Sequence, residues 1–95
     1  MKKAVIYGAT STGKMVYEKV KHKYNILYFV DGNPSLIGST VEKIPVKDPE
    51  IILLDQPDIV VMGILTGYEE AVEYLVEKGY PEENILCQYV DLNSR

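Results

Sequence analysis

The chain has 95 residues, a length that predicts one domain over residues 1–95, and its hydrophobic (46%) and charged (25%) fractions are ordinary for a globular protein. No apolar run approaches the roughly 20 residues that a membrane-spanning helix needs, so we expect no membrane association. The formal net charge of −4 argues against binding of nucleic acid through a basic surface. The single cysteine, Cys87, excludes an internal disulfide and a cysteine-based metal site.

The N-terminal residues predict a strand rather than a secretion signal. Residues 3–7 form a short β-rich run that Gly8 ends at once, so there is no long apolar region and no small-residue cleavage site. We therefore expect the protein in the cytoplasm.

Further apolar runs predict more strands, at residues 25–30, 58–62 and 84–87. Near-continuous apolar runs are typical of strands that are covered on both faces, as in parallel sheets. Residues 44–46 (Ile-Pro-Val) predict a short edge strand, because proline is tolerated at sheet edges.

Segments with helical periodicity separate these strands. Apolar and glycine residues recur at helical spacing in two of them: Gly13, Val16, Tyr17, Val20 and Tyr24, and then Tyr68, Ala71, Val72, Leu75, Val76 and Gly79. A shorter helix is expected from residue 48 to residue 55, with a proline in its first turn.

The second of these periodic segments has a predicted start and a predicted end. Thr66 and Glu69 fit a capping box, in which both side chains hydrogen-bond to free backbone amides. Gly79 can take the left-handed conformation that ends a helix, and Pro81 prevents continuation.

The alternation of strands and helices predicts the α/β class, with a three-layer, Rossmann-like parallel sheet and right-handed crossovers. The expected strand order is 3-2-1-4-5, with a short third strand. Ligands of such sheets bind beyond the carboxyl ends of the strands, where the strand order reverses. Here that point lies between the strand that ends at Gly8 and the strand that ends at Gly63.

The turn after the first strand has the spacing of a dinucleotide-binding fingerprint. In the pattern G-x-G-x-x-G, Gly8 and Gly13 match the first and last glycines, and Thr10 replaces the middle one. The amides at the start of the following helix, together with its dipole, favour an anion. The candidate binding residues are Gly8, Ala9, Thr10, Ser11, Thr12, Gly13 and Lys14, with Gly63 from the neighbouring strand.

Asp31 lies at the end of the second strand, 23 residues after Gly8. A carboxylate at this place can accept hydrogen bonds from ribose hydroxyls and would repel a 2′-phosphate, so NAD is expected to bind better than NADP. The same residue also begins a turn sequence, Asp31-Gly32-Asn33-Pro34, in which aspartate is a common turn former. Both interpretations stay open.

A P-loop is the main alternative for the glycine turn. Gly8, Gly13 and Lys14 match G-x-x-x-x-G-K, but Met15 stands where the hydroxyl that binds magnesium is needed. The apolar run that ends at Asp55 is better explained as a short helix than as a metal-binding strand. No arrangement around His22 or Cys87 indicates catalysis, so we expect no catalytic residue.

Several segments together resemble one family. They are Ala4-Val5-Ile6-Tyr7-Gly8-Ala9, Gly13-Lys14, Phe29-Val30-Asp31-Gly32-Asn33-Pro34, Ile37-Gly38, Ile44-Pro45-Val46 and Asp58-Ile59-Val60-Val61, with Gly79-Tyr80-Pro81-Glu82-Glu83-Asn84-Ile85 near the end. The chain resembles the Rossmann-like N-terminal domain of bacterial sugar O-acyltransferases of the sialic-acid and pilin-glycosylation type. The resemblance implies a nucleotide-sugar near Gly8, Gly13 and Asp31 and a role in polysaccharide biosynthesis. The β-helix that carries acyl transfer in that family is absent up to Arg95, so no acyltransferase activity is expected of this chain.

The sequence therefore predicts a nucleotide-binding module for a nucleotide-sugar or a dinucleotide, with UDP-sugars and NAD as the candidate ligands and no catalysis of its own. A partner protein or a missing catalytic domain would then supply the reaction. One alternative is an NAD-binding subunit or fragment of a dehydrogenase. Another is a degenerate Rossmann domain that serves as a protein-interaction module.

Overall fold

The expected alternation of strands and helices is present in the computed structural model, which describes residues 1–89. The strands are β1 (Lys3–Tyr7), β2 (Asn25–Val30), β3 (Thr40–Val41), β4 (Ile44–Lys47), β5 (Ile59–Met62) and β6 (Ile85–Leu86). The helices are α1 (Ser11–Val20), α2 (Ile51–Asp55) and α3 (Tyr68–Glu77), with a 3₁₀ turn at Glu82–Asn84.

The sheet has the order β3-β4-β2-β1-β5-β6, and every pairing is parallel except that of β3 with β4. The expected order 3-2-1-4-5 is found for β4-β2-β1-β5-β6, and the sheet differs from the prediction by one additional strand, β3. The prediction of residues 44–46 as an edge strand is wrong, because β3 pairs with β4 on its outer side. Pro45 is tolerated there because the neighbouring Val46 makes the backbone hydrogen bonds on this side of β4. Its amide donates to the Ser39 carbonyl at 2.9 Å, and its carbonyl accepts from the Gly38 amide at 2.9 Å.

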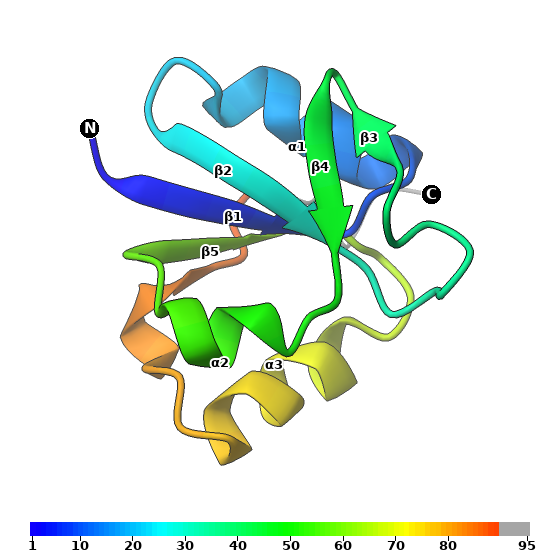
Figure 1. Ribbon diagram of the computed structural model, residues 1–95. Coiled ribbons are helices and arrows are strands. Elements are labelled where there is room, and N and C mark those ends of the chain that lie inside the picture. The colour runs from blue at the N-terminus through cyan, green and yellow to red at the C-terminus, as the bar shows by residue number, and fades with distance from the viewer. Residues whose placement is uncertain (90–95) are drawn as a thin grey trace.

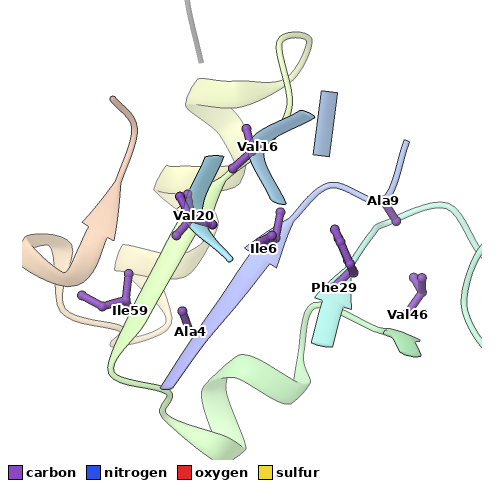
Figure 2. Close-up of a cluster of buried hydrophobic side chains, with 9 residues drawn as sticks. Ala4, Ile6, Ala9, Val16, Val20, Phe29, Val46 and Ile59 are labelled. Atoms are coloured by element: carbon purple, nitrogen blue, oxygen red, sulfur yellow. The ribbon is translucent and has the colours of Figure 1, made fainter. Parts of the chain in front are cut away.

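Helices cover both faces of the sheet, with α1 on one side and α2 and α3 on the other (Figure 1). The side chains of β1 alternate between the two layers: Ala4 and Ile6 belong to the α1-side cluster, and Val5 belongs to the cluster under α2 and α3. Figure 2 shows the α1-side cluster, in which Ile6 and Phe29 from the sheet pack with Val16 from α1. The central strands are therefore apolar throughout, as the sequence predicts for a sheet covered on both faces.

Two predictions about helix ends need correction. Helix α1 ends at Val20, so Tyr24 packs against the core from the turn after the helix rather than from its face. The capping box of Thr66 and Glu69 is wrong: the N-cap of α3 is Gly67, which is left-handed (φ 76°), and no side chain caps the helix. Thr66 is therefore one residue before the N-cap, and not at the position from which a capping box is made.

The end of α3 follows the sequence prediction. Gly79 is left-handed (φ 102°), and its amide donates to Val76 at 3.0 Å, while the amide of Tyr80 donates to Leu75 at 2.9 Å. This pair of bonds is a Schellman motif, which satisfies the last carbonyls of the helix. It also buries the Tyr80 ring in the core, where only 2% of the residue is exposed.

Candidate functional site

Three glycines meet where the strand order reverses, and their backbones leave no room for side chains. A Cβ on Gly13 would overlap the Gly8 carbonyl oxygen, and a Cβ on Gly8 would overlap the Gly63 carbonyl oxygen. A Cβ on Gly63 would lie 2.9 Å from the Gly13 Cα, which is closer than real Cβ contacts allow. Gly8 also has a φ of 121°, which favours glycine. These contacts bring the start of α1 directly against the carboxyl ends of β1 and β5.

The first turn of α1 has free amide donors. Thr10 is the N-cap but makes no side-chain capping bond, and the turn contains no acidic residue. The Lys14 amide donates to the Thr10 carbonyl at 2.9 Å, whereas within residues 1–89 the amides of Ser11, Thr12 and Gly13 have no acceptor. Free amides and the helix dipole together give this end of α1 a partial positive charge.

Asp31 connects this turn to the end of β2. Its Oδ2 accepts a hydrogen bond from the Ala9 amide at 3.0 Å, and its Oδ1 accepts one from the Asn33 amide at 2.9 Å. The turn interpretation of Asp31 is therefore confirmed by the second bond. A carboxylate has about four lone-pair positions, so each oxygen of Asp31 can still accept a further hydrogen bond.

Asp31 also lines a cleft of about 370 Å³ beside α3. The other lining residues come from the end of β1, the turn after β2, the loop after β5 and the first turns of α3. They are Tyr7, Gly32, Ile64, Thr66, Gly67, Glu70, Ala71 and Tyr74. Sequence reasoning missed all of these, although the rule that ligands bind beyond strand ends points to Tyr7 and to the residues after Gly63.

The cleft is acidic, and its phenols are protonated at neutral pH. Among residues 1–89, its lining includes the carboxylates of Asp31 and Glu70 and no lysine, arginine or histidine. Burial raises the pKa of Tyr7, and the neighbouring Tyr74 and the charges of Asp31 and Asp48 raise it further. Burial likewise raises the pKa of Tyr74, with Glu50 and Asp48 adding to the effect. Both hydroxyls can therefore donate hydrogen bonds into an environment that disfavours anions.

The remaining predicted site residues do not line this cleft. Lys14 is exposed and lies 3.4 Å from a Glu42 carboxylate oxygen on the turn between β3 and β4. Thr10 and Ser11 are exposed, and Thr12 is partly buried. The structure thus brings Gly8, Gly13 and Gly63 together and joins Ala9 to Asp31, but it places Lys14 toward the β3–β4 hairpin.

The other chemical candidates of the sequence lie elsewhere. The expected helix is present and is not a metal-binding strand, but α2 comprises residues 51–55 and begins three residues later than predicted. His22 is exposed, and Cys87 is half-buried in a second groove along α3 rather than fully buried in the core. Within residues 1–89, no group of three or more histidine, cysteine, aspartate or glutamate side chains is placed to hold a metal ion.

Comparison with solved structures defines the class of the protein as a Rossmann-like domain. The Rex-family repressor RSP superposes with a TM-score of 0.69 at 23% identity, over 83% of this chain and 42% of RSP. The complex of RSP with β-NAD⁺ and operator DNA gives 0.67 at 20% identity, over 90% of this chain and 49% of RSP. UDP-D-quinovosamine 4-dehydrogenase from Vibrio fischeri gives 0.63 at 18% identity, over 81% of this chain and 71% of that chain. At these identities the likeness shows the fold, and the chain spans less than half of the RSP structures.

The chain belongs to the C2185-like N-terminal domain family, because residues 1–86 match the model of that family. No curated protein matches the chain. Among the residues that the structure describes, no helix is both long and apolar enough to cross a bilayer.

Proposed function

We propose that this domain binds a nucleotide-containing ligand, either a nucleotide-sugar or a dinucleotide such as NAD, and has no catalysis of its own. One observation carries the proposal: the Asp31 carboxylate lines the cleft and at the same time accepts the Ala9 amide of the glycine turn. The cleft and the free amides of α1 are therefore neighbouring parts of one surface. Such a surface suits a ligand with an uncharged part and an anionic part.

Electrostatics assigns the two parts of the ligand to different places. A diphosphate is favoured at the first turn of α1, where the amides of Ser11, Thr12 and Gly13 are free. It is disfavoured in the cleft, which contains two carboxylates and no basic side chain. The nucleoside therefore belongs in the cleft, and the diphosphate lies over the turn of Gly8 to Gly13, against Gly63. Lys14 would approach the phosphates only after leaving Glu42, which costs little because the pair is exposed.

The cleft offers suitable partners for a nucleoside. Asp31 has free lone pairs for ribose hydroxyls, and the protonated phenols of Tyr7 and Tyr74 can donate to ring or ribose oxygens. Ile64 and Ala71 give it apolar surface. Its volume of about 370 Å³ is near the lower end of the range of about 300–1,000 Å³ for small-molecule sites, which suits one nucleoside.

The related structures support both ligand classes. RSP was solved with β-NAD⁺ and with β-NADH, and the Vibrio fischeri enzyme is named for a UDP-sugar. Both kinds of ligand contain a nucleoside diphosphate, which is the part that this surface suits. One RSP complex also contains operator DNA, whereas the net charge of −4 of this chain favours a small-molecule ligand.

A thermal-melt panel with NAD⁺, NADP⁺, ATP, UDP, UDP-sugars and coenzyme A tests the proposal. A ligand at 100 times its Kd adds about 2.7 kcal/mol to the free energy of unfolding, and each kcal/mol shifts the Tm of a small domain by about 4–8 °C. We expect an upward shift with NAD⁺ or with a UDP compound. No shift with any nucleotide would refute the proposal and would favour the protein-interaction module.

Asp31→Asn is the matching variant, and Asp58→Asn is its control. Both carboxylates accept a backbone amide, Asp58 from Lys3 at 2.9 Å, but Asp58 lies at the amino end of the strands. The amide of asparagine keeps one acceptor for Ala9, but it loses the negative charge and the second acceptor, which Asn33 uses. We expect Asp31→Asn to weaken binding of the ligand about 10-fold or more, as for loss of a hydrogen bond to a charged group, and Asp58→Asn to leave the Kd unchanged. An equal loss in both variants would contradict the proposed site.

A further inference from the structure

Glu70 is the second carboxylate of the cleft, and no sequence motif points to it. It lies in the first turn of α3, whereas Asp31 follows β2, so the two charges come from elements that are far apart in the chain. Both residues line the same cleft of about 370 Å³. An anion bound there lies near both carboxylates, and their charges repel it.

The surroundings add to this negative potential. Asp48 and Glu50 lie near enough to the cleft tyrosines for their charges to raise the pKa of Tyr74. Lys47, which precedes Asp48 in the sequence, has its ammonium over the Tyr28 ring, 4.8 Å from the ring centroid, and does not line the cleft. No cation among the lining residues compensates for the carboxylates.

The adjacent Glu69 provides an internal comparison. Both glutamates are in the first turn of α3, where a negative charge stabilises the helix through its dipole. Glu70 lines the cleft, and Glu69 lines the second groove, on another side of the helix. Any effect that is specific to Glu70 therefore comes from its position in the cleft and not from its place in the helix.

We infer that Glu70 is a specificity-determining residue: with Asp31, it restricts the cleft to nucleosides whose ribose hydroxyls are free and excludes ligands with a phosphomonoester on that ribose. NADP, with its 2′-phosphate, and coenzyme A, with its 3′-phosphate, belong to the excluded class. A phosphomonoester adds about −1.5 to −2 charges at pH 7, which both carboxylates repel. This inference rests on the proposed function and names the class of nucleotide that the site accepts.

Binding titrations with the wild-type chain, Glu70→Gln and Glu69→Gln test it. The ligands are compared in pairs, NADP⁺ with NAD⁺ and adenosine 3′,5′-bisphosphate with ADP. If only uridine nucleotides bind, uridine 3′,5′-bisphosphate is compared with UDP. Glu70→Gln removes one charge about 8 Å away in a partly aqueous setting. We therefore expect it to lower the ratio of the Kd of the ligand with the 2′- or 3′-phosphate to the Kd of the other ligand of the pair, by about 3- to 10-fold. Glu69→Gln should change this ratio less than 2-fold. Added salt should reduce the discrimination of the wild-type chain.

The possible outcomes separate the inference from the proposed function. Binding of unphosphorylated nucleotides with an unchanged ratio in Glu70→Gln would refute the role of Glu70 and leave the proposed function intact. Equal effects of Glu69→Gln and Glu70→Gln would also refute it, because the effect would then come from overall charge. If no nucleotide binds to the wild-type chain, the proposed function is wrong and this inference is wrong with it.

Discussion

At the scale of single residues, Gly13 is the glycine with the least room for a side chain. A side chain there meets the Gly8 carbonyl, which belongs to the backbone and cannot rotate away. The substitution must therefore push α1 off the sheet, and this separates the packing of Val16 from Ile6.

Gly13→Ala should accordingly lower the free energy of unfolding by about 2–4 kcal/mol, at or above the usual cost of overpacking. Gly32→Ala is the control, because a Cβ at Gly32 meets nothing within 4 Å and its φ is not left-handed; its effect should stay within about 0.5 kcal/mol. Urea denaturation of both variants measures the difference. Equal stability of the two variants would show that α1 does not contact the end of β1 as described.

Tyr80 makes the free energy of unfolding depend on pH in the alkaline range. Burial, with a smaller contribution from the charge of Asp58, raises its pKa to about 12, and its hydroxyl donates to the Pro57 carbonyl at 2.7 Å. Because the pKa is higher in the folded state than in the unfolded chain, where it is about 10, the folded state binds more protons in this range. The stabilisation is complete below pH 10 and is lost as the pH rises toward 12.

We expect the free energy of unfolding to fall between pH 10 and pH 12. Urea denaturation at closely spaced pH values measures this fall. Tyr80→Phe removes this ionisation and should make the fall shallower, even though the variant is less stable at neutral pH. The remaining slope comes from the other tyrosines whose pKa is raised. One of them is Tyr28, whose pKa is raised by burial and by its hydrogen bond to Asp55 at 3.0 Å. A Tyr80→Phe curve parallel to that of the wild-type chain would contradict this account.

At the scale of elements, the β3–β4 hairpin has an unusual turn. Its two turn residues, Glu42 (φ 52°) and Lys43 (φ 66°), are both left-handed, as a type I′ turn requires. Neither residue favours this conformation, so the pairing of β3 with β4 holds the turn. This is why the sequence predicts only one strand in this region.

Lys43→Gly should therefore stabilise the protein, by about 0.5–1 kcal/mol, because glycine adopts the left-handed conformation without strain and this gain exceeds its extra entropy when unfolded. Thr40→Gly, in the neighbouring strand β3, should destabilise it by about 0.5–1 kcal/mol, since glycine weakens a regular strand. Thermal denaturation of both variants checks the opposite signs. A destabilising Lys43→Gly would mean that the turn is not left-handed in solution.

At the scale of the whole molecule, both hydrophobic layers share the same central strands. Val61 of β5 belongs to the layer under α1, and Val60 belongs to the layer under α2 and α3, and both are fully buried. Loss of packing on one face therefore removes support from strands that the other face also needs. We expect one cooperative transition for the whole chain.

Val60→Ala and Val61→Ala should each cost about 1.5–3 kcal/mol, from lost burial plus the cavity left behind. Far-ultraviolet circular dichroism and tyrosine fluorescence should give coincident midpoints in both variants. A second transition in either variant would show that the two layers unfold independently.

The strand order illustrates how much of the fold could be predicted. Apolar runs that end at Gly8 and Gly63, with helical periods between them, determine which strands are central and where the order reverses. The pattern failed where local chemistry is unusual: at the Glu42-Lys43 turn, which lacks turn-forming residues, and at Gly67, which displaced a plausible capping box. At the turn, strand pairing holds Glu42 and Lys43 in a conformation that these residues do not favour. At Gly67, the glycine itself readily takes the left-handed conformation, and the helix begins one residue later than the capping box predicts.

In the candidate site, the glycine turn and Asp31 could be predicted from the sequence alone, because tight turns and strand ends depend on residue type and spacing along the chain. That Tyr7, Glu70 and Tyr74 share a cleft with Asp31 became clear only from the folded structure. These side chains come from β1, β2 and α3, and their distances depend on how α3 packs on the sheet rather than on any local spacing. The charge of the cleft is therefore a product of the packing, and it is the packing that defines which part of a nucleotide the cleft suits.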